Sequence, residues 1–154
     1  AVASYLREEA IRLRFCSRSD CLRLGVALEE ALLNAYYHGN LEISSELREQ
    51  DHEAYHNLAA QRSREAPYKD RRIYVSVRMS STQAVYTVRD EGPGFDPSTL
   101  PDPTDPANLD RPCGRGLLLM RTFMDNVIYN DQGNEVTLFK ERESDVEEVE
   151  LDDE

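Results

Sequence analysis

The sequence predicts an α+β domain in which helices cover one face of a mixed, mostly antiparallel sheet. Three observations support this fold class. Apolar residues recur at helical spacing in the first forty residues, two later segments alternate apolar and polar residues, and a helix-like run followed by a strand-like run comes near the end. Because the helices come first and the strands pair through a short turn, we expect two packed layers.

Two helices are predicted near the N-terminus, over residues 2–15 and 21–40. Residues 17–20, Ser-Arg-Ser-Asp, supply N-cap candidates between them, and the pair Gly39-Asn40 is typical of a helix end. The second helix is the more apolar of the two, so we expect it to lie in the core. The apolar positions of the first helix are Val2, Leu6, Ala10 and Leu13.

The strand-like segments come later in the chain. Residues 72–79 and 84–90 alternate apolar and polar residues on either side of the turn Ser-Ser-Thr-Gln, which predicts an antiparallel hairpin. A helix is predicted over 117–127, and a last strand over 134–140 follows the turn Asn-Asp-Gln-Gly-Asn. Residues 42–70 are charged and helix-permissive, and we interpret them as a helical insert.

Length and charge limit the function classes. The chain of 154 residues suffices for one domain, predicted over 1–142, and the tail 143–154, with eight acids and no Lys or Arg, is predicted to be disordered. The net charge of −12 argues against direct binding of nucleic acid, because phosphate backbones need clustered positive charge. No run approaches the ~18–20 apolar residues of a membrane span.

The cysteines Cys16, Cys21 and Cys113 are odd in number and lack C-x-x-C spacing. This pattern predicts neither a disulfide framework nor a cysteine zinc site. We also expect no signal peptide, so the sequence favours a reducing cytoplasm as the location of the protein.

A short motif in the insert suggests metal chemistry. His52-Glu53-Ala54-Tyr55-His56 matches H-E-x-x-H, in which two imidazoles one helical turn apart hold Zn²⁺ and the glutamate acts as general base. The flanking residues are charged and no third ligand stands out. A zinc peptidase is therefore the weakest of the functions considered.

A row of polar residues on the second predicted helix is a stronger signal. Glu30, Asn34 and His38 are spaced four residues apart, so they share one face of a helix that is otherwise mostly apolar. A carboxylate and a carboxamide one turn apart can activate a nucleophile and bind a hard metal ion. His38 either lines the same pocket or caps the helix end, and an exposed polar stripe is the alternative for all three.

The segment 91–116 is a long loop rich in proline and glycine, of a length that is usually functional. It is preceded by Asp90 at the end of a predicted strand, and Gly92 and Gly94 then allow the backbone to approach a ligand closely. On its own, the pattern Asp-x-Gly-x-Gly also fits an ordinary turn.

At the other end of this loop, Gly114-Arg115-Gly116 opens the predicted helix 117–127. Free N–H groups at a helix N-terminus favour an anion such as phosphate, and Arg115 adds a cation. The pattern does not match a Walker P-loop.

Taken in this order, the three patterns resemble the N, G1 and G2 boxes of the GHKL ATPase superfamily. The stretches that carry the resemblance are 25–40, 88–106 and 114–129, and they look most similar to the anti-sigma-factor serine/threonine kinases. The resemblance implies a Bergerat-type two-layer α/β sandwich that binds ATP and Mg²⁺. It extends over about residues 20–140, with the insert 42–70 outside it.

The resemblance also implies roles for individual residues. Glu30 would be the general base, Asn34 would bind the Mg²⁺ that bridges the phosphates, and Asp90 would accept the adenine N6 hydrogen bond. Residues 95–113 would form the ATP lid. The other nucleotide contacts would come from Gly92, Gly94, Gly114, Arg115, Gly116, Leu117 and, on the last strand, Thr137.

The implied activity is phosphorylation of a small anti-sigma-antagonist protein on Ser or Thr, with a sigma factor as a further partner and a homodimer as the assembly. The alternative is a non-kinase ATP-binding module of a larger signalling protein. Glu30, at the position of the base, favours an active kinase, whereas the insert and the absence of a strand before the first helix favour a module.

Overall fold

The computed structural model describes residues 1–100 and 115–143, with Arg115 described by its backbone only. Helices and strands follow the order expected from the sequence, with one additional strand. In chain order they are α1 (Val2–Arg12), α2 (Arg18–Asn34), the π-helical turn η1 (Ala35–Asn40), α3 (Ser45–Gln50), α4 (His52–Arg62), the 3-10 turn η2 (Tyr68–Asp70), β1 (Tyr74–Met79), β2 (Gln83–Arg89), the 3-10 turn η3 (Pro97–Thr99), α5 (Arg115–Phe123), β3 (Asn126–Tyr129) and β4 (Glu135–Glu141).

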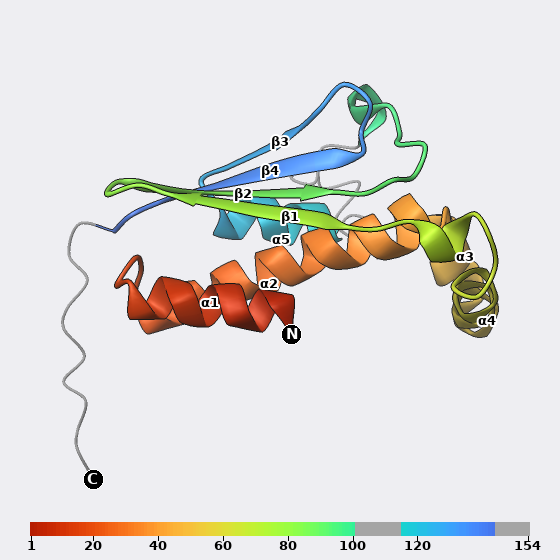
Figure 1. Ribbon diagram of the computed structural model, residues 1–154, viewed down its shortest axis with the longest axis horizontal. Coiled ribbons are helices and arrows are strands. Elements are labelled where there is room, and N and C mark those ends of the chain that lie inside the picture. Colours follow the sequence, from red (N-terminus) through yellow and green to blue (C-terminus); the bar gives the residue numbers. More distant parts are fainter. Residues whose placement is uncertain (101–114, 144–154) are drawn as a thin grey trace, which may run out of the picture.

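The domain has two layers. The strands form one sheet in the order β1-β2-β4-β3, and every neighbouring pair is antiparallel. The helices α1, α2 and α5 lie against one face of this sheet, with α2 in contact with both others (Figure 1). The predicted α+β class with helices on one face is confirmed, and in the described part of the chain the sheet is wholly antiparallel rather than mixed.

The core lies between the two layers. Alternate residues of β2 are buried, as expected for a strand with one face on a core, while the residues between them are partly exposed. The neighbouring strand β4 repeats this alternation, and α2 and α5 supply the apolar side chains opposite. The buried residues include Ala84, Tyr86, Val88, Val136, Leu138, Leu24, Leu28 and Met120.

A disulfide bond joins Cys16 and Cys21, so the prediction of no disulfide is wrong for this pair. Helix α1 ends earlier than predicted, and Arg14, with φ 54°, turns the chain back toward the core. Ser17 then caps α2 by accepting a hydrogen bond from the Asp20 N–H (3.3 Å). This tight connection brings the two Cα atoms to 5.7 Å, within the usual disulfide range.

Strand β3 was not predicted, because residues 117–127 were assigned to a single helix. The helix ends at Phe123 instead, and the Asp125 N–H donates to the Phe139 carbonyl (2.8 Å) at the point where pairing with β4 begins. The apolar spacing continues across this break, which is why the sequence read as one helix. Because β4 would otherwise be a sheet edge, the segment with the β-branched pair Val127-Ile128 pairs with it as a fourth strand.

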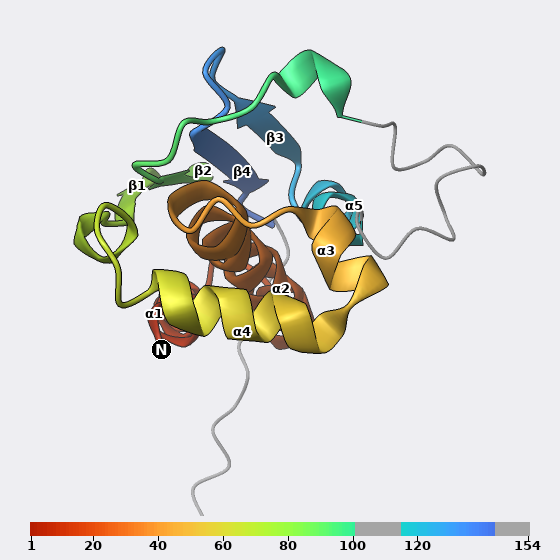
Figure 2. The same ribbon diagram turned by 90° about the vertical axis from the view of Figure 1, so that its right-hand side faces the viewer.

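The insert 42–70 folds as α3, α4 and η2 and packs across the end of α2 (Figure 2). It has its own small apolar cluster, formed by Leu41, Ile43, Tyr55 and Ala59, with Tyr37 of η1 packed against it. Two arginines fasten the segment to the end of η1. Arg62 Nη1 donates to the Leu41 and Glu42 carbonyls, and Arg71 Nη1 donates to the Asn40 carbonyl and pairs with the Glu42 carboxylate, all at 2.7–2.8 Å.

The predicted tail begins one residue too early. The Glu143 N–H donates to the Phe15 carbonyl (3.1 Å), and Glu143 Oε2 accepts from the Ser17 N–H (3.1 Å), so Glu143 belongs to the folded domain. The rest of the predicted tail, 144–154, lies outside the described residues. None of the described helices combines the length and the apolarity of a membrane span.

Candidate functional site

A cavity of about 640 Å³ opens at the end of the domain where α2 passes into η1. Its walls come from α2 and η1, from the ends of β2 and β4, from the start of α5 and from the α3–α4 segment. Residues that line it include Glu30, Asn34, His38, Gly39, Ile43, Arg48, His52, Val88, Asp90, Gly94, Phe95, Leu100, Gly116, Leu117, Tyr129, Asn134 and Val136. Its volume falls in the range of about 300–1,000 Å³ that is usual for small-molecule sites.

The polar row on the second helix faces this cavity. Glu30, Asn34 and His38 all line it, whereas the neighbouring Glu29 is exposed and does not. Of the alternatives for His38, the structure places its side chain at the cavity, and its Nδ1 lies 2.6 Å from the carbonyl oxygen of Ile43, which follows the helix. The row is therefore a wall of the cavity rather than a solvated stripe.

The start of α5 lies against Glu30 and Asn34 of this polar row. A Cβ atom on Gly116 would lie 2.8 Å from Glu30 Oε2 and 3.3 Å from Asn34 Nδ2, so glycine lets the helix approach the two polar side chains without displacing them. Leu117 follows as a buried residue of the same wall. Gly114 and the side chain of Arg115 lie outside the described residues. The helix N-terminus thus meets the carboxylate and carboxamide that the sequence singled out.

Asp90 is a buried carboxylate at the opposite side of the cavity, with a side chain that is 7% exposed. Its Oδ1 accepts a hydrogen bond from the Gly92 N–H (2.9 Å), and its own N–H donates to the Asn134 carbonyl (2.9 Å). Burial raises the pKa of Asp90, although the Gly92 hydrogen bond and the charge of Arg71 act against this. Within the described part of the chain no hydrogen bond reaches Oδ2, which leaves this oxygen as an acceptor for a ligand.

A contact that the sequence did not predict holds Asp90 in place. Gly39 of η1 lies directly against its carboxyl group, where a Cβ would overlap Cγ and Oδ2. The π-helical turn makes this approach feasible, because the Leu41 N–H bonds to the Tyr36 carbonyl five residues back and widens the helix end. Asn40, also buried, accepts from the Glu91 N–H through its Oδ1 (2.7 Å). Gly39 was interpreted from sequence only as a helix end.

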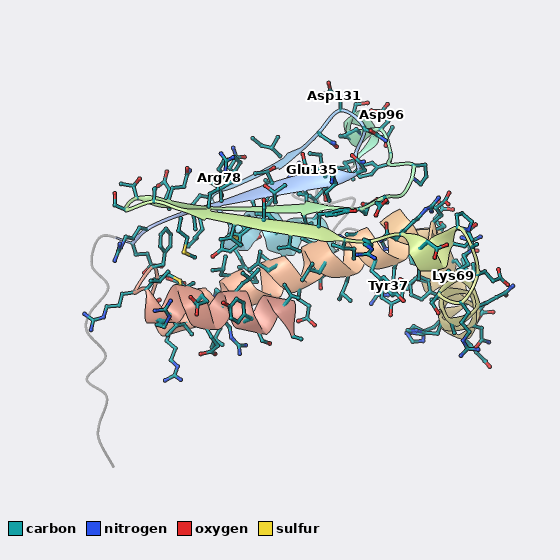
Figure 3. All side chains as sticks on the ribbon, viewed as in Figure 1. Tyr37, Lys69, Arg78, Asp96, Asp131 and Glu135 are labelled. Atoms are coloured by element: carbon teal, nitrogen blue, oxygen red, sulfur yellow. A yellow bond between two sulfur atoms is a disulfide. The ribbon has the colours of Figure 1, made fainter. Side chains whose placement is uncertain are left out.

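The segment after β2 folds onto the turn between β3 and β4. Gly94 has φ +77°, a conformation that L side chains rarely adopt, and a side chain there would overlap the Gln132 carbonyl group. The Phe95 and Tyr129 rings meet edge to face, 5.3 Å apart between centroids, and both line the cavity. The segment after β2, which carries Asp96, meets the turn between β3 and β4 at one end of the sheet (Figure 3). Gly92 lies beside Asp90 and Gly39 but is not among the residues that line the cavity.

Thr137 is not brought to the cavity. Its neighbours Val136 and Leu138 are the buried, helix-facing residues of β4, and strand alternation places Thr137 on the other face, paired with Thr87 and Ile128. The prediction that Thr137 contacts a ligand from the sheet therefore does not fit this register. Val136, one residue earlier, lines the cavity instead.

The H-E-x-x-H motif lies on the exposed side of α4. The Nε2 atoms of His52 and His56 are 3.1 Å apart, and both side chains and Glu53 are exposed. Among residues 1–100 and 115–143, no group of three His, Cys, Asp or Glu side chains is placed to hold a metal ion. Within these residues the motif has no third ligand of the kind that a zinc peptidase needs.

The arrangement suits a small ligand with a polar, hydrogen-bonding ring and an anionic end. One side of the cavity offers a buried acceptor, Asp90, next to apolar Val88 and Val136. Another side offers Glu30 and Asn34 against the N-terminal turn of a helix, which has N–H groups and a positive dipole end.

Comparison with known protein families identifies the family of the chain. Residues 1–140 match the family described as "Histidine kinase-like ATPase domain". No curated protein matched the chain. Because the match spans nearly the whole chain, and because the fold has helices on one face of an antiparallel sheet, the chain belongs to the histidine kinase-like ATPase domain family of GHKL type.

Proposed function

We propose that this protein binds Mg–ATP in the cavity and transfers the γ-phosphoryl group to a Ser or Thr hydroxyl of a small partner protein. The observation that carries the proposal is that Asp90, distant in sequence from Glu30 and Asn34, lines the same cavity as these two residues. Family membership supports ATP binding in general. The kinase activity, the partner and the role of each residue are our inference.

Asp90 would read the adenine ring. Its Oδ2 can accept a hydrogen bond from the adenine N6 amino group, since Oδ1 is already bonded to the Gly92 N–H. The apolar Val88 and Val136 would pack against the ring faces, and Gly39 and Gly94 would keep the surrounding backbone close. Guanine carries a carbonyl oxygen where adenine has this amino group, so a carboxylate at this place favours adenine.

Asn34 and the start of α5 would hold the phosphate end. Asn34 would ligate, through its carboxamide oxygen, an Mg²⁺ that neutralises the phosphate charge and orients the γ-phosphoryl group. Gly114, Arg115 and Gly116 would cover the phosphates, and Leu117 would pack behind them. Gly116 supports this proposal, since it lies close to Glu30 and Asn34.

Glu30 would act as the general base. As the partner's hydroxyl oxygen bonds to the γ-phosphorus, its proton passes to the Glu30 carboxylate, and the bond from the γ-phosphorus to the β–γ bridging oxygen breaks to release ADP. Glu30 is half-buried and lines the cavity, so it can reach a group that enters beside the phosphates. The partner would be an anti-sigma-antagonist-like protein, with a sigma factor as a further ligand.

Replacing Asn34 tests the proposed magnesium site. Asn34→Ala is expected to weaken ATP binding about tenfold in the presence of Mg²⁺, the order of one lost oxygen contact to a charged group. Without Mg²⁺ the variant and the wild type should bind ATP equally. Calorimetric titration with Mg²⁺ and with EDTA measures both, and a loss of equal size under the two conditions would contradict the metal role.

Phosphoryl transfer separates a kinase from an ATP-binding module. The protein is incubated with labelled ATP, Mg²⁺ and candidate anti-sigma-antagonist proteins, and we expect label on a Ser or Thr of one partner. ATP binding without transfer to any partner would favour the regulatory module instead. No binding of ATP at all would overturn the proposed function.

A further inference from the structure

The α3–α4 segment forms a wall of the cavity, although no sequence pattern connects it with the nucleotide site. Ser44, Arg48 and His52 of this segment line the same cavity as Asn34 and Asp90. Figure 2 shows α3 beside the end of α2, with α4 crossing below it. The segment is therefore placed to contact a nucleotide, and the question is which group it offers.

The charges around the cavity point to Arg48. Among the described side chains that line it, four are acids, and Arg48 is the one permanent cation. A nucleotide triphosphate brings several negative charges into this acidic surrounding, so a cation nearby stabilises it. The four acids are Glu30, Glu49, Asp90 and Glu135.

Arg48 is an exposed side chain whose guanidinium lies over one aromatic ring of the fold. Its guanidinium lies over the ring of the buried Tyr55, 5.9 Å from the centroid, and within the described residues it makes no ion pair. By contrast, Arg62 at the end of α4 and Arg71 after the insert donate hydrogen bonds to backbone carbonyls, and Arg71 also pairs with Glu42. Arg48 thus keeps its guanidinium donors for a ligand.

Capping hydrogen bonds define the start of the helix that carries Arg48 and of the helix that follows it. Ser44 Oγ accepts from the Glu46 N–H (3.1 Å) at the start of α3, and Asp51 Oδ1 accepts from the Ala54 N–H (3.0 Å) at the start of α4. These caps set where both short helices begin. Tyr55, which supports the guanidinium, packs on Tyr37 of η1 with 5.4 Å between ring centroids.

We propose that Arg48 binds the phosphate groups of the nucleotide, so that the α3–α4 segment is part of the nucleotide site. This inference rests on the proposed function, because it assumes that ATP occupies the cavity. It assigns a phosphate-binding residue outside the three sequence boxes that carry the resemblance.

The test compares ligands with and without phosphates. Arg48→Gln is expected to weaken Mg–ATP binding about fivefold to tenfold and to leave adenosine binding within about twofold of the wild type, because only ATP carries the charges that Arg48 meets. The affinity of the variant for ATP should also depend less on salt. Arg48→Lys keeps the charge but not the planar, forked guanidinium, so its affinity for Mg–ATP should lie between that of the wild type and that of Arg48→Gln.

Arg64→Gln is the matched control, since Arg64 is exposed in the same segment but does not line the cavity. It should bind ATP as the wild type does. Equal weakening by Arg48→Gln and Arg64→Gln, unchanged ATP binding by Arg48→Gln, or a parallel loss of adenosine would each overturn the proposal. A wild type that binds neither ATP nor adenosine would overturn the proposed function itself.

Discussion

Glu30→Gln is expected to lower the rate of phosphoryl transfer to a partner protein by about 10²–10⁴-fold, the usual contribution of a general base. The carboxamide has the same shape as the carboxylate but cannot take the hydroxyl proton. Because Glu30 would act on the partner's hydroxyl and not on ATP, the affinity for ATP should change by no more than about threefold. Single-turnover transfer of labelled phosphate together with ATP titration measures the two quantities.

The adjacent Glu29 provides the control for this prediction. It has the same charge and lies on the same helix, but it is exposed and does not line the cavity. Glu29→Gln should transfer phosphate at the wild-type rate. If Glu30→Gln transfers as fast as the wild type, or if its ATP affinity falls as far as its rate, Glu30 is not the base.

Asp90→Asn is expected to weaken ATP binding by about 10- to 100-fold, the range for a lost hydrogen bond to a charged group. The Gly92 N–H already bonds Oδ1, so the amide oxygen of Asn keeps that contact and its NH₂ takes the place of Oδ2. A donor would then face the adenine amino group. Titration calorimetry with ATP measures the effect, and a wild-type affinity would contradict the role of Asp90.

The same substitution has the opposite effect on the protein without ligand. Burial raises the pKa of Asp90, so the folded state binds this proton more tightly than the unfolded chain, and the ionised carboxyl lowers stability at neutral pH. This cost disappears as the pH falls through the raised pKa and is absent below the ordinary value of 3.8. Asp90→Asn should therefore be more stable than the wild type at neutral pH.

Paired denaturant curves at several pH values test this second effect. The difference in unfolding free energy between Asp90→Asn and the wild type should be largest at neutral pH and shrink as the solution is acidified. A difference that grows toward acid pH would mean that the Asp90 carboxylate stabilises the folded domain, contrary to its burial. The combination of lower affinity and higher stability is typical of a group kept for binding.

Local patterns in the sequence predicted much of the cavity. Glu30, Asn34 and His38 share a face because helical spacing places them there, and all three line the cavity. The hairpin of β1 and β2 followed from alternation and a turn. Asp90 was found because it ends a strand next to two glycines. Each of these signals lies within one element and needs no knowledge of the packing between elements.

Features that depend on packing between elements escaped the sequence. The contact of Gly39 with Asp90 needs the π-helical turn of η1 and the approach of a segment fifty residues away. Strand β3 forms because β4 offers an edge. The disulfide between Cys16 and Cys21 depends on the turn between two helices. Thr137 was assigned by resemblance alone, and the alternation of β4 places it on the face opposite Val136 and Leu138.

The sequence also did not show which residues of the insert reach the cavity. Its H-E-x-x-H motif suggested a metal site, yet His56 and Glu53 are exposed and only His52 reaches the cavity. Arg48, which no motif singled out, is the one arginine or lysine among the described residues that line the cavity. The packing of the insert against η1, through Arg62 and Arg71, determines which of its side chains reach the cavity. No short sequence pattern indicates this packing.

The most direct test of the central claim, an adenine-nucleotide site read by Asp90, is a titration of the wild type and Asp90→Asn with ATP and with GTP. The wild type should bind ATP at least about a hundredfold more tightly than GTP, because guanine would turn a carbonyl oxygen toward a buried carboxylate. In Asp90→Asn the new NH₂ group can donate to that oxygen, so the preference should shrink or reverse. Equal binding of ATP and GTP by the wild type, or an unchanged preference in the variant, would contradict the account.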